Sequence, residues 1–214
     1  MSLDFARSEW KEFVKSPAKV ILLIFSFALM VLMLHLIANF ICNIEHRQGF
    51  AFDDPLLSLF KPIDLTWLIF SVLYFSVIFV VIQLLSNPRK LILGFLSYSL
   101  LLSFRILAMY LLPLDPPKNI ILLKDPLIEY FGTDVTLTRD LFFSGHTSLM
   151  VLLFLLSEGK VAKILLLCGV VVVGLGVMLQ NVHYSVDVLV AIFAGYCSFA
   201  WTKAILSRFK IYPK

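Results

Sequence analysis

The sequence predicts an all-α, polytopic membrane protein built as a six-transmembrane-helix bundle. Of its 214 residues, 60% are hydrophobic and only 15% are charged, whereas soluble domains carry about 25% charged residues. Apolar runs long enough to cross a bilayer core, which takes about 20 helical residues, recur six times. These runs lack the alternation that is typical of barrel strands. The composition therefore excludes an ordinary soluble domain, a disordered chain and a nucleic-acid-binding domain.

The six predicted spans follow one another along the chain. They cover residues 20–41, 65–86, 91–112, 141–157, 162–180 and 184–206. The fourth span is the shortest, and a Leu-Asp-Pro-Pro turn at 114–117 ends the third. We predict a single integral membrane domain over 1–214, in which a six-helix core at 20–206 lies between a leader at 1–19 and a cytoplasmic tail at 207–214.

The leader is charged and amphipathic, which is typical of a helix that lies in the membrane interface. The first span is too long for a signal-peptide core and no small-residue cleavage site follows it, so we expect the leader to stay in the mature protein. Cytoplasmic flanks collect Lys and Arg. With a cytoplasmic N-terminus, twelve of the 18 Lys and Arg residues flank the inner side, five lie in outer loops, and Arg105 lies within the third span. We therefore expect both termini in the cytoplasm.

The remaining bulk properties fit the same class of protein. The net charge of +4 is better explained by cytoplasmic flanks than by a nucleic-acid partner. Three cysteines occur without CxxC spacing, so the sequence predicts neither a disulfide framework nor a zinc site.

Three ionisable side chains lie within predicted spans at a similar depth from the outer side: Arg105, His146 and Asp187. Such groups are costly in a membrane and usually face a bundle interior or a water-filled cavity. At 1.5 Å per helical residue, Arg105 lies roughly 10 Å below the outer surface and the other two roughly 5 to 8 Å. Because the spans alternate in direction, this agreement is not forced by spacing in the sequence. It predicts one shared polar cavity.

His183 and Asp187 are four residues apart, a spacing that places two side chains on one face of a helix. A carboxylate beside an imidazole fixes which ring nitrogen carries the proton, and the other nitrogen is then free to attack or to take a proton. The pair therefore suits a nucleophile or base with its orienting group. The alternative is a structural polar pair that ties the sixth helix to a neighbour.

Ser144, Gly145, His146 and Thr147 stand at the outer entrance of the fourth span. Serine is a good N-cap, glycine lets a ligand approach the backbone, and the first-turn amides with the helix dipole behind them bind anions. A phosphate oxygen fits such a place, with His146 as proton donor to a leaving oxygen. The alternative is a helix start with a small-residue packing notch.

Arg105 offers a planar fork that binds phosphate and cannot be deprotonated, or else an internal salt bridge to Asp187 or Asp140. Taken together, two histidines, one carboxylate and one arginine at a common depth predict a phosphoryl-transfer site with no metal and no cofactor. Two histidines and one aspartate are also possible zinc ligands, but the adjacent arginine opposes a cation.

The motifs at the start of the fourth and sixth spans resemble those of a known family. The sequences LFFSGHT at 141–147 and HYSVDV at 183–188 are similar to the SGHT and HYxxDV motifs of the sphingomyelin synthase-like branch of the type 2 phosphatidic acid phosphatase (PAP2) superfamily. Weaker similarities precede them in KPID at 61–64 and in the arginine-bearing third span. The resemblance covers roughly 20–206 and is specific in its last third.

This resemblance implies a phosphohistidine mechanism. His183 would be the nucleophile that attacks a lipid phosphate, and Asp187 would orient and charge-stabilise it. His146 would protonate the departing diacylglycerol oxygen and then serve as general base in the second half of the reaction. The residues that we expect to bind the substrate are Arg105, Ser144, Gly145 and Tyr184.

The chain also departs from the phosphatases of this superfamily. It contains no Arg-Pro dipeptide, Val177 stands where those enzymes carry an arginine six residues before the nucleophilic histidine, and Phe143 replaces the proline of their PSGH motif. The loss of these phosphate-binding cations favours the transferase branch.

We therefore expect an integral membrane enzyme that transfers a phospho-head group from a phospholipid donor to a lipid alcohol acceptor, ceramide or diacylglycerol, at the exoplasmic or periplasmic face. One alternative is a lipid phosphate phosphatase of the same superfamily, in which water resolves the intermediate. The other is a non-catalytic membrane protein or transporter that uses a His/Asp relay. The expected partners are membrane lipids and not nucleic acid, and the sequence indicates no particular oligomeric state.

Overall fold

The computed structural model describes residues 3–125 and 138–212. Within these ranges the chain forms seven α-helices, one short 3-10 helix, η1 (Leu57–Leu59), and no β-strand. The α-helices are α1 (Leu3–Phe13), α2 (Pro17–Ile44), α3 (Thr66–Leu85), α4 (Pro88–Leu111), α6 (Gly145–Leu156), α7 (Lys160–Leu179) and α8 (Ser185–Arg208). The predicted all-α fold class is confirmed for the described residues.

Five of these helices, α2, α3, α4, α7 and α8, are long and apolar enough to cross a membrane. Each coincides with a predicted span to within a few residues at either end. The composition of these helices indicates a membrane protein.

The fourth predicted span, 141–157, is shorter than expected, because α6 has only 12 residues. Phe142 and Phe143 have φ of 60° and 62°, a left-handed conformation that a helix does not contain. Ser144 then has an extended backbone and acts as the N-cap, so the helix begins four residues later than predicted. Twelve residues rise about 18 Å, less than the roughly 30 Å of a bilayer core, so a sixth full crossing stays a prediction.

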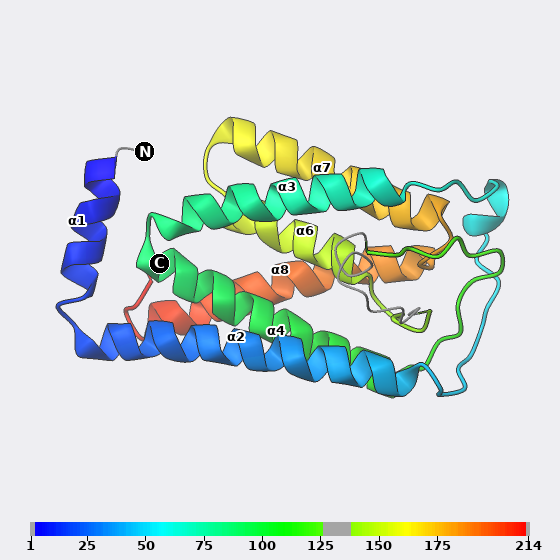
Figure 1. Cartoon of the computed structure of the whole chain (residues 1–214), viewed down its shortest axis with the longest axis horizontal. Helices are drawn as coiled ribbons and strands as arrows, with labels where there is room; N and C mark the ends of the chain where they lie inside the picture. Colours follow the sequence, from blue (N-terminus) through cyan, green and yellow to red (C-terminus); the bar gives the residue numbers. More distant parts are fainter. Residues whose placement is uncertain (1–2, 126–137, 213–214) are drawn as a thin grey trace.

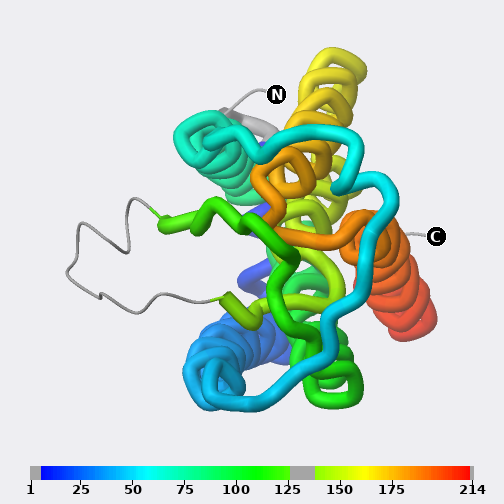
Figure 2. The backbone as a smooth tube through the Cα atoms, turned by 90° about the vertical axis from the view of Figure 1, so that its right-hand side faces the viewer, coloured from blue at the N-terminus to red at the C-terminus, as the bar shows by residue number. Residues whose placement is uncertain are grey.

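The long helices run side by side along the long axis of the molecule (Figure 1). The connections that follow α2 and α7 and those that precede α3 and α6 gather at one end, which we call the loop end, whereas α1 lies across the opposite end (Figure 1). The view onto the loop end shows α6 in the middle of the bundle (Figure 2). It packs against α3, α4, α7 and α8, while α2 packs on α4. The first turn of α6 is therefore enclosed by longer helices.

Close packing of α8 on α6 depends on small residues. A Cβ added at Gly195 would lie 2.9 Å from the carbonyl oxygen of Ser148 in α6, which is too close for any larger residue. Ala191, one turn earlier, is fully buried. The two helices that carry the candidate site are thus held at short range.

A buried glutamine connects α7 to the start of α3. The Gln180 side chain accepts a hydrogen bond from the Leu65 amide (3.1 Å) and donates one to the Thr66 hydroxyl (2.9 Å). The main-chain carbonyl oxygen of Gln180 accepts a third from the Ile121 amide (3.0 Å). Because a buried amide needs such partners, Gln180 fixes the loop end at this point.

The predicted leader forms α1 and then breaks before Pro17, the first residue of α2. The Trp10 indole donates a hydrogen bond to the carbonyl of Leu85, the last residue of α3 (2.8 Å), and the Phe13 side chain is only 1% exposed. The leader is thus docked against the bundle. At the other terminus, α8 continues to Arg208, so the predicted tail starts within the helix.

Candidate functional site

The residues that the sequence singled out gather at the loop end. Arg105 lies in the last two turns of α4, His146 in the first turn of α6 and Asp187 in the first turn of α8, while His183 lies in the connection between α7 and α8. The chain directions in Figures 1 and 2 place these starts and ends at the same end of the bundle.

His183 and Asp187 form a buried pair. The Nδ1 atom of His183 lies 3.2 Å from Oδ2 of Asp187, and the two side chains are 2% and 0% exposed. The route to this contact differs from the one predicted, because His183 precedes α8 and the two residues do not share a helical face. Oδ2 of Asp187 also accepts a hydrogen bond from the amide of Tyr184, the N-cap residue (3.2 Å). The carboxylate thus caps its own helix and reaches the imidazole just before it.

The turn before His183 is set by the end of α7. Asn181 has φ of 54°, its amide donates to the Met178 carbonyl (2.9 Å), and the next amide, that of Val182, donates to the Val177 carbonyl (3.0 Å). This pair of bonds is a Schellman motif, and asparagine is one of the few residues that adopt its left-handed position readily. The chain therefore reverses within a few residues and presents His183 to the bundle interior.

Ser144 is the N-cap of α6, as predicted. Its hydroxyl accepts a hydrogen bond from the Thr147 amide (3.3 Å), and its own amide donates to the main-chain carbonyl of Asp187 (3.2 Å). This last bond joins the first turns of α6 and α8 directly. The two sequence motifs, far apart in the chain, therefore form one unit.

Arg105 pairs with Asp140 and not with Asp187, which decides between the two salt bridges that the sequence allowed. The guanidinium lies against the backbone of Gly145, since a Cβ added there would overlap its Nη1 atom and lie 2.5 Å from its Cζ atom. The sequence led us to expect a ligand close to the backbone of Gly145, and in the structure the Arg105 side chain occupies this place. A fixed positive charge stands beside the first turn of α6.

The charge of Asp140 is coupled to the other ionisable groups of the site. Burial by itself raises the pKa of the Asp140 carboxyl, but Arg105, then His183 and His146, act together to hold that pKa below its ordinary value. Sequence reasoning considered Asp140 only as a partner of Arg105, but its charge is also stabilised by the two histidines of the site.

Three buried polar atoms of the site have no hydrogen-bond partner among the residues that the structure describes: Nε of Arg105, Nδ1 of His146 and Oδ1 of Asp187. The amides of Gly145 and His146, the first two of α6, likewise find no acceptor in the described part of the chain. Buried polar groups are normally paired. The donors among these atoms match the oxygens of a phosphate, which helix N-termini and arginine bind.

Tyr184, expected to bind substrate, is engaged in packing. Its ring stacks on Phe52 with 4.1 Å between centroids, its hydroxyl donates to the carbonyl of Asp115 (3.0 Å), and the residue is buried. The geometry thus gives Tyr184 a role in holding two connections of the loop end against the start of α8.

Sequence reasoning missed Asp54. Its Oδ2 atom accepts a 2.6 Å hydrogen bond from the amide of Ser185, the first residue of α8, and it comes from the connection that crosses the loop end between α2 and α3 (Figure 2). The contact spans 131 residues of sequence, and no local pattern in the sequence predicts it.

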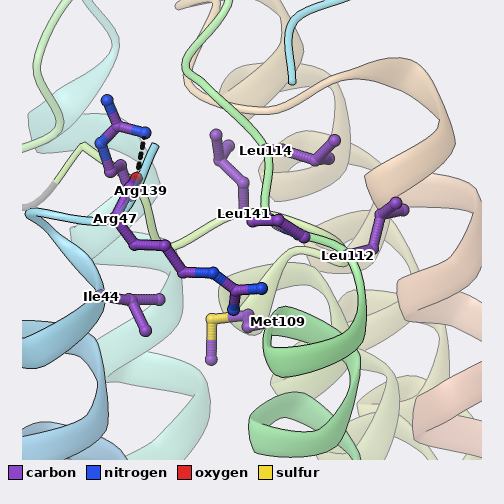
Figure 3. Close-up of a pocket in the computed structure, with 8 residues that line it drawn as sticks. Ile44, Arg47, Met109, Leu112, Leu114, Arg139 and Leu141 are labelled. Atoms are coloured by element: carbon purple, nitrogen blue, oxygen red, sulfur yellow. Dashed lines mark hydrogen bonds between the residues drawn. The ribbon is translucent and has the colours of Figure 1, made fainter. Parts of the chain in front are cut away.

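A small recess lies beside the site, and Figure 3 shows its lining side chains. Arg139, the neighbour of Asp140, pairs with Asp115 and donates a 2.6 Å hydrogen bond to the carbonyl of Arg47. The Glu45 carboxylate accepts hydrogen bonds from the amides of Thr138 and Arg139 (both 3.1 Å). The segment that leads into α6 is thereby tied to the end of α2.

Among the described ranges, no group of three or more His, Cys, Asp or Glu side chains is placed to hold a metal ion. The site therefore consists of His183 with Asp187, His146, Arg105 paired with Asp140, and the N-terminus of α6.

Comparison with known proteins adds one finding. No curated protein and no solved structure shows significant similarity to the chain. Residues 139–205 match the family model "PAP2 superfamily C-terminal", and the matched stretch includes Asp140, both histidines and Asp187. This match supports membership of the chain in the PAP2 superfamily, whose members are generally phosphatases or phosphotransferases.

Proposed function

We propose that the chain is an integral membrane enzyme that transfers a phospho-head group from a phospholipid to a lipid alcohol, ceramide or diacylglycerol, through a phosphohistidine. The observation that carries this proposal is the buried bond between His183 and Asp187 beside the Arg105–Asp140 pair and the N-terminus of α6. That set provides a nucleophile, its orienting group and positive charge for phosphate in one enclosed place.

In the first half of the reaction His183 attacks the lipid phosphorus. Because Nδ1 faces Asp187, Nε2 is the nitrogen that forms the new P–N bond, and the P–O bond to diacylglycerol breaks. His146 gives its proton to the departing oxygen. Arg105 and the free amides at the start of α6 stabilise the charge on the phosphoryl oxygens.

In the second half a lipid hydroxyl enters in place of diacylglycerol. His146, now neutral, accepts the proton of this hydroxyl, the hydroxyl oxygen attacks phosphorus, and the P–N bond breaks. Both histidines return to their starting states, so that the reaction needs no cofactor.

Burial favours transfer over hydrolysis. The side chains of His183 and Asp187 are almost completely excluded from solvent, and an intermediate in a dry site is protected from water. Val177, at the position where the phosphatases carry a phosphate-binding arginine, is buried against the core, so that the positive charge comes from Arg105 instead. The lipid phosphatase remains the second candidate, because it differs only in what resolves the intermediate.

The proposal includes a topology. The five long helices and the shorter α6 form the six-span bundle, both termini lie in the cytoplasm, and the loop end faces the exoplasmic or periplasmic side. In this arrangement the first turn of α6 lies below the outer surface, where the phosphate of an outer-leaflet lipid can reach it, and the chain on either side of this short helix completes the crossing.

The test uses the purified full chain in mixed micelles with a phospholipid labelled in its phosphate, and with fluorescent ceramide and diacylglycerol offered separately. The variant is His183→Ala, and the matched control is His46→Ala, because His46 is exposed at the loop end. We expect a labelled lipid product and acid-labile label trapped on the protein, both lost only in His183→Ala.

Water-soluble label without a lipid product would favour the phosphatase. Label retained by His183→Ala would contradict the assigned nucleophile, and no turnover of any lipid would favour the transporter.

A further inference from the structure

A second recess opens at the loop end, next to the segment that carries His183. It encloses about 820 Å³ including its open mouth, and we call it the acidic recess. The side chains used below are Phe52, Asp53, Asp54, Lys118, Asn181 and Tyr184, all of which line it. Asn181 and Tyr184 stand on either side of His183 in the chain, so the acidic recess adjoins the candidate catalytic segment.

One buried acceptor in the acidic recess lacks a partner. The Asn181 side chain is 5% exposed, and its Nδ2 atom donates a 3.1 Å hydrogen bond to the Lys118 carbonyl, which fixes the orientation of the amide. The Oδ1 atom is buried and accepts no hydrogen bond from any residue that the structure describes. A buried amide oxygen calls for an N–H or O–H donor.

The acidic recess also carries negative charge that is only partly balanced. Asp53 pairs with Lys118 (2.9 Å), whereas no cationic side chain of the described residues pairs with Asp54. Burial by itself raises the pKa of Asp54, but hydrogen bonds from Ser185 and Leu56 hold that pKa below its ordinary value, so the carboxylate is charged at neutral pH. The recess therefore favours a cation.

Aromatic rings form one wall of the acidic recess. Phe52 stacks on Tyr184 with 4.1 Å between centroids, so these two ring faces cover one another. The preference for a cation therefore rests on Asp54, and the choice among cations rests on Asn181 Oδ1. This oxygen needs an N–H or O–H donor, and a quaternary ammonium has no N–H to donate.

We propose that the acidic recess binds a primary ammonium group, such as the one on the head group of an amine-bearing phospholipid. Asn181 Oδ1 accepts one N–H of this group, and Asp54 balances its charge. The inference deepens the proposed function, and it rests on that function where the ammonium belongs to a phospholipid. In that case the ammonium lies in the acidic recess while the phosphate of the same head group lies at His183.

The first experiment compares phosphatidylethanolamine, phosphatidylcholine and phosphatidylglycerol with identical acyl chains as donors to the full chain in mixed micelles. We expect kcat/KM to favour the primary amine over the quaternary one by on the order of tenfold or more, the effect of one hydrogen bond to a charged group. Asn181→Gly keeps the left-handed backbone and removes the acceptor, so we expect this preference to vanish. Asn181→Asp keeps the shape and adds negative charge, so the preference grows. Lys210→Gly, at another left-handed position (φ 56°) on the opposite end, is the matched control.

The second experiment separates binding from turnover and a lipid from a free amine. The His183→Ala protein is titrated with phosphoethanolamine, phosphocholine and ethanolamine, and binding is followed by calorimetry. Binding of phosphoethanolamine that is lost in His183→Ala/Asn181→Gly supports the inference, even if no lipid is turned over and the proposed function fails. Equal binding by ethanolamine alone assigns the recess to free amines. The inference is overturned if turnover and binding are the same with and without a primary amine and are unchanged by Asn181→Gly. Asn181 Oδ1 would then be hydrogen-bonded by water.

Discussion

The absence of a side chain at Gly145 leaves room for the guanidinium of Arg105. The Arg105 guanidinium, held by Asp140, occupies the space that a side chain at Gly145 would fill. We expect Gly145→Ala to push the guanidinium away from the first turn of α6 and to lower kcat/KM on the order of 100-fold, as misplacing a catalytic group by about 1 Å does. Overpacking should cost about 1–3 kcal/mol in unfolding free energy. Steady-state kinetics and thermal unfolding in detergent measure both effects.

A glycine at the opposite end of α4 provides the control. A Cβ at Gly94 would meet only the end of the Leu84 side chain, at 3.1 Å, and a terminal methyl of Leu156 at 3.7 Å, and alanine is the better helix former by about 1 kcal/mol. Gly94→Ala should therefore keep kcat/KM within about twofold of the wild type. Equal losses in both variants would mean that the Gly145 effect reflects general destabilisation and not the position of Arg105.

Asp187 contacts the His183 imidazole and also caps α8. A variant at another helix start shows how much of its effect comes from capping alone. Asp187→Asn removes the negative charge that faces His183 Nδ1 and the Tyr184 amide and leaves one acceptor atom in place of two, so the imidazole is held and stabilised less well. We expect kcat to fall on the order of 10²- to 10⁴-fold, as when the orienting carboxylate of a catalytic triad is replaced. Asp64→Asn, which weakens the cap of α3 at Thr66 without touching a histidine, should leave kcat unchanged. Near-normal kcat in Asp187→Asn would exclude the dyad.

At the scale of elements, the apolar periodicity predicted five long helices well because each is set by its own composition. The positions that differ depend on contacts between elements. Phe142 and Phe143 turn the chain before α6 in a left-handed conformation that no local signal in these residues indicates. His183 meets Asp187 through the N-cap geometry of α8 and not through a helical face. The spacing of four residues thus predicted the contact correctly, but the contact does not arise from a shared helical face.

The same limit applies to the site. The position of Ser144 as N-cap, with Gly145 and His146 in the first turn of α6, was predictable because capping is a local property of a helix N-terminus. The Arg105–Asp140 pair crosses 35 residues and was one of two alternatives. Asp54 reaches α8 across 131 residues and was not predicted, since a single sequence contains no signal for such a long-range contact.

Helix α1 is predicted to stabilise the bundle and not to act in the reaction. Phe13 is buried where α1 meets the rest of the chain, far along the bundle from the loop end (Figure 1). We expect Phe13→Ala to lower the unfolding free energy by about 3–5 kcal/mol while kcat of the folded protein is unchanged. Chemical unfolding in detergent measures the first, and kinetics at low temperature the second. Val14→Ala, at an exposed neighbour, should change neither, and a fall in kcat for Phe13→Ala would connect α1 to the site.

For the whole molecule, the two ends differ in charge. Among the described residues, the segments at the α1 end contain eleven Lys and Arg residues against four Asp and Glu, whereas the loop end, with Arg105, contains six against eight. Because cationic flanks are usually retained in the cytoplasm, this difference supports the proposed orientation, in which the loop end faces outward. An acidic loop end also fits the proposed binding of an ammonium group in the acidic recess.

This orientation can be tested with single cysteines in a background that lacks Cys42, Cys168 and Cys197. Ser58→Cys lies in η1 at the loop end and Lys210→Cys follows α8 at the opposite end, and both positions are exposed. In intact cells a membrane-impermeant maleimide should label Ser58→Cys, and it should label Lys210→Cys only after permeabilisation. The reverse pattern would place the loop end in the cytoplasm, and the proposed enzyme would then act on lipids of the inner leaflet, because both histidines lie at the loop end.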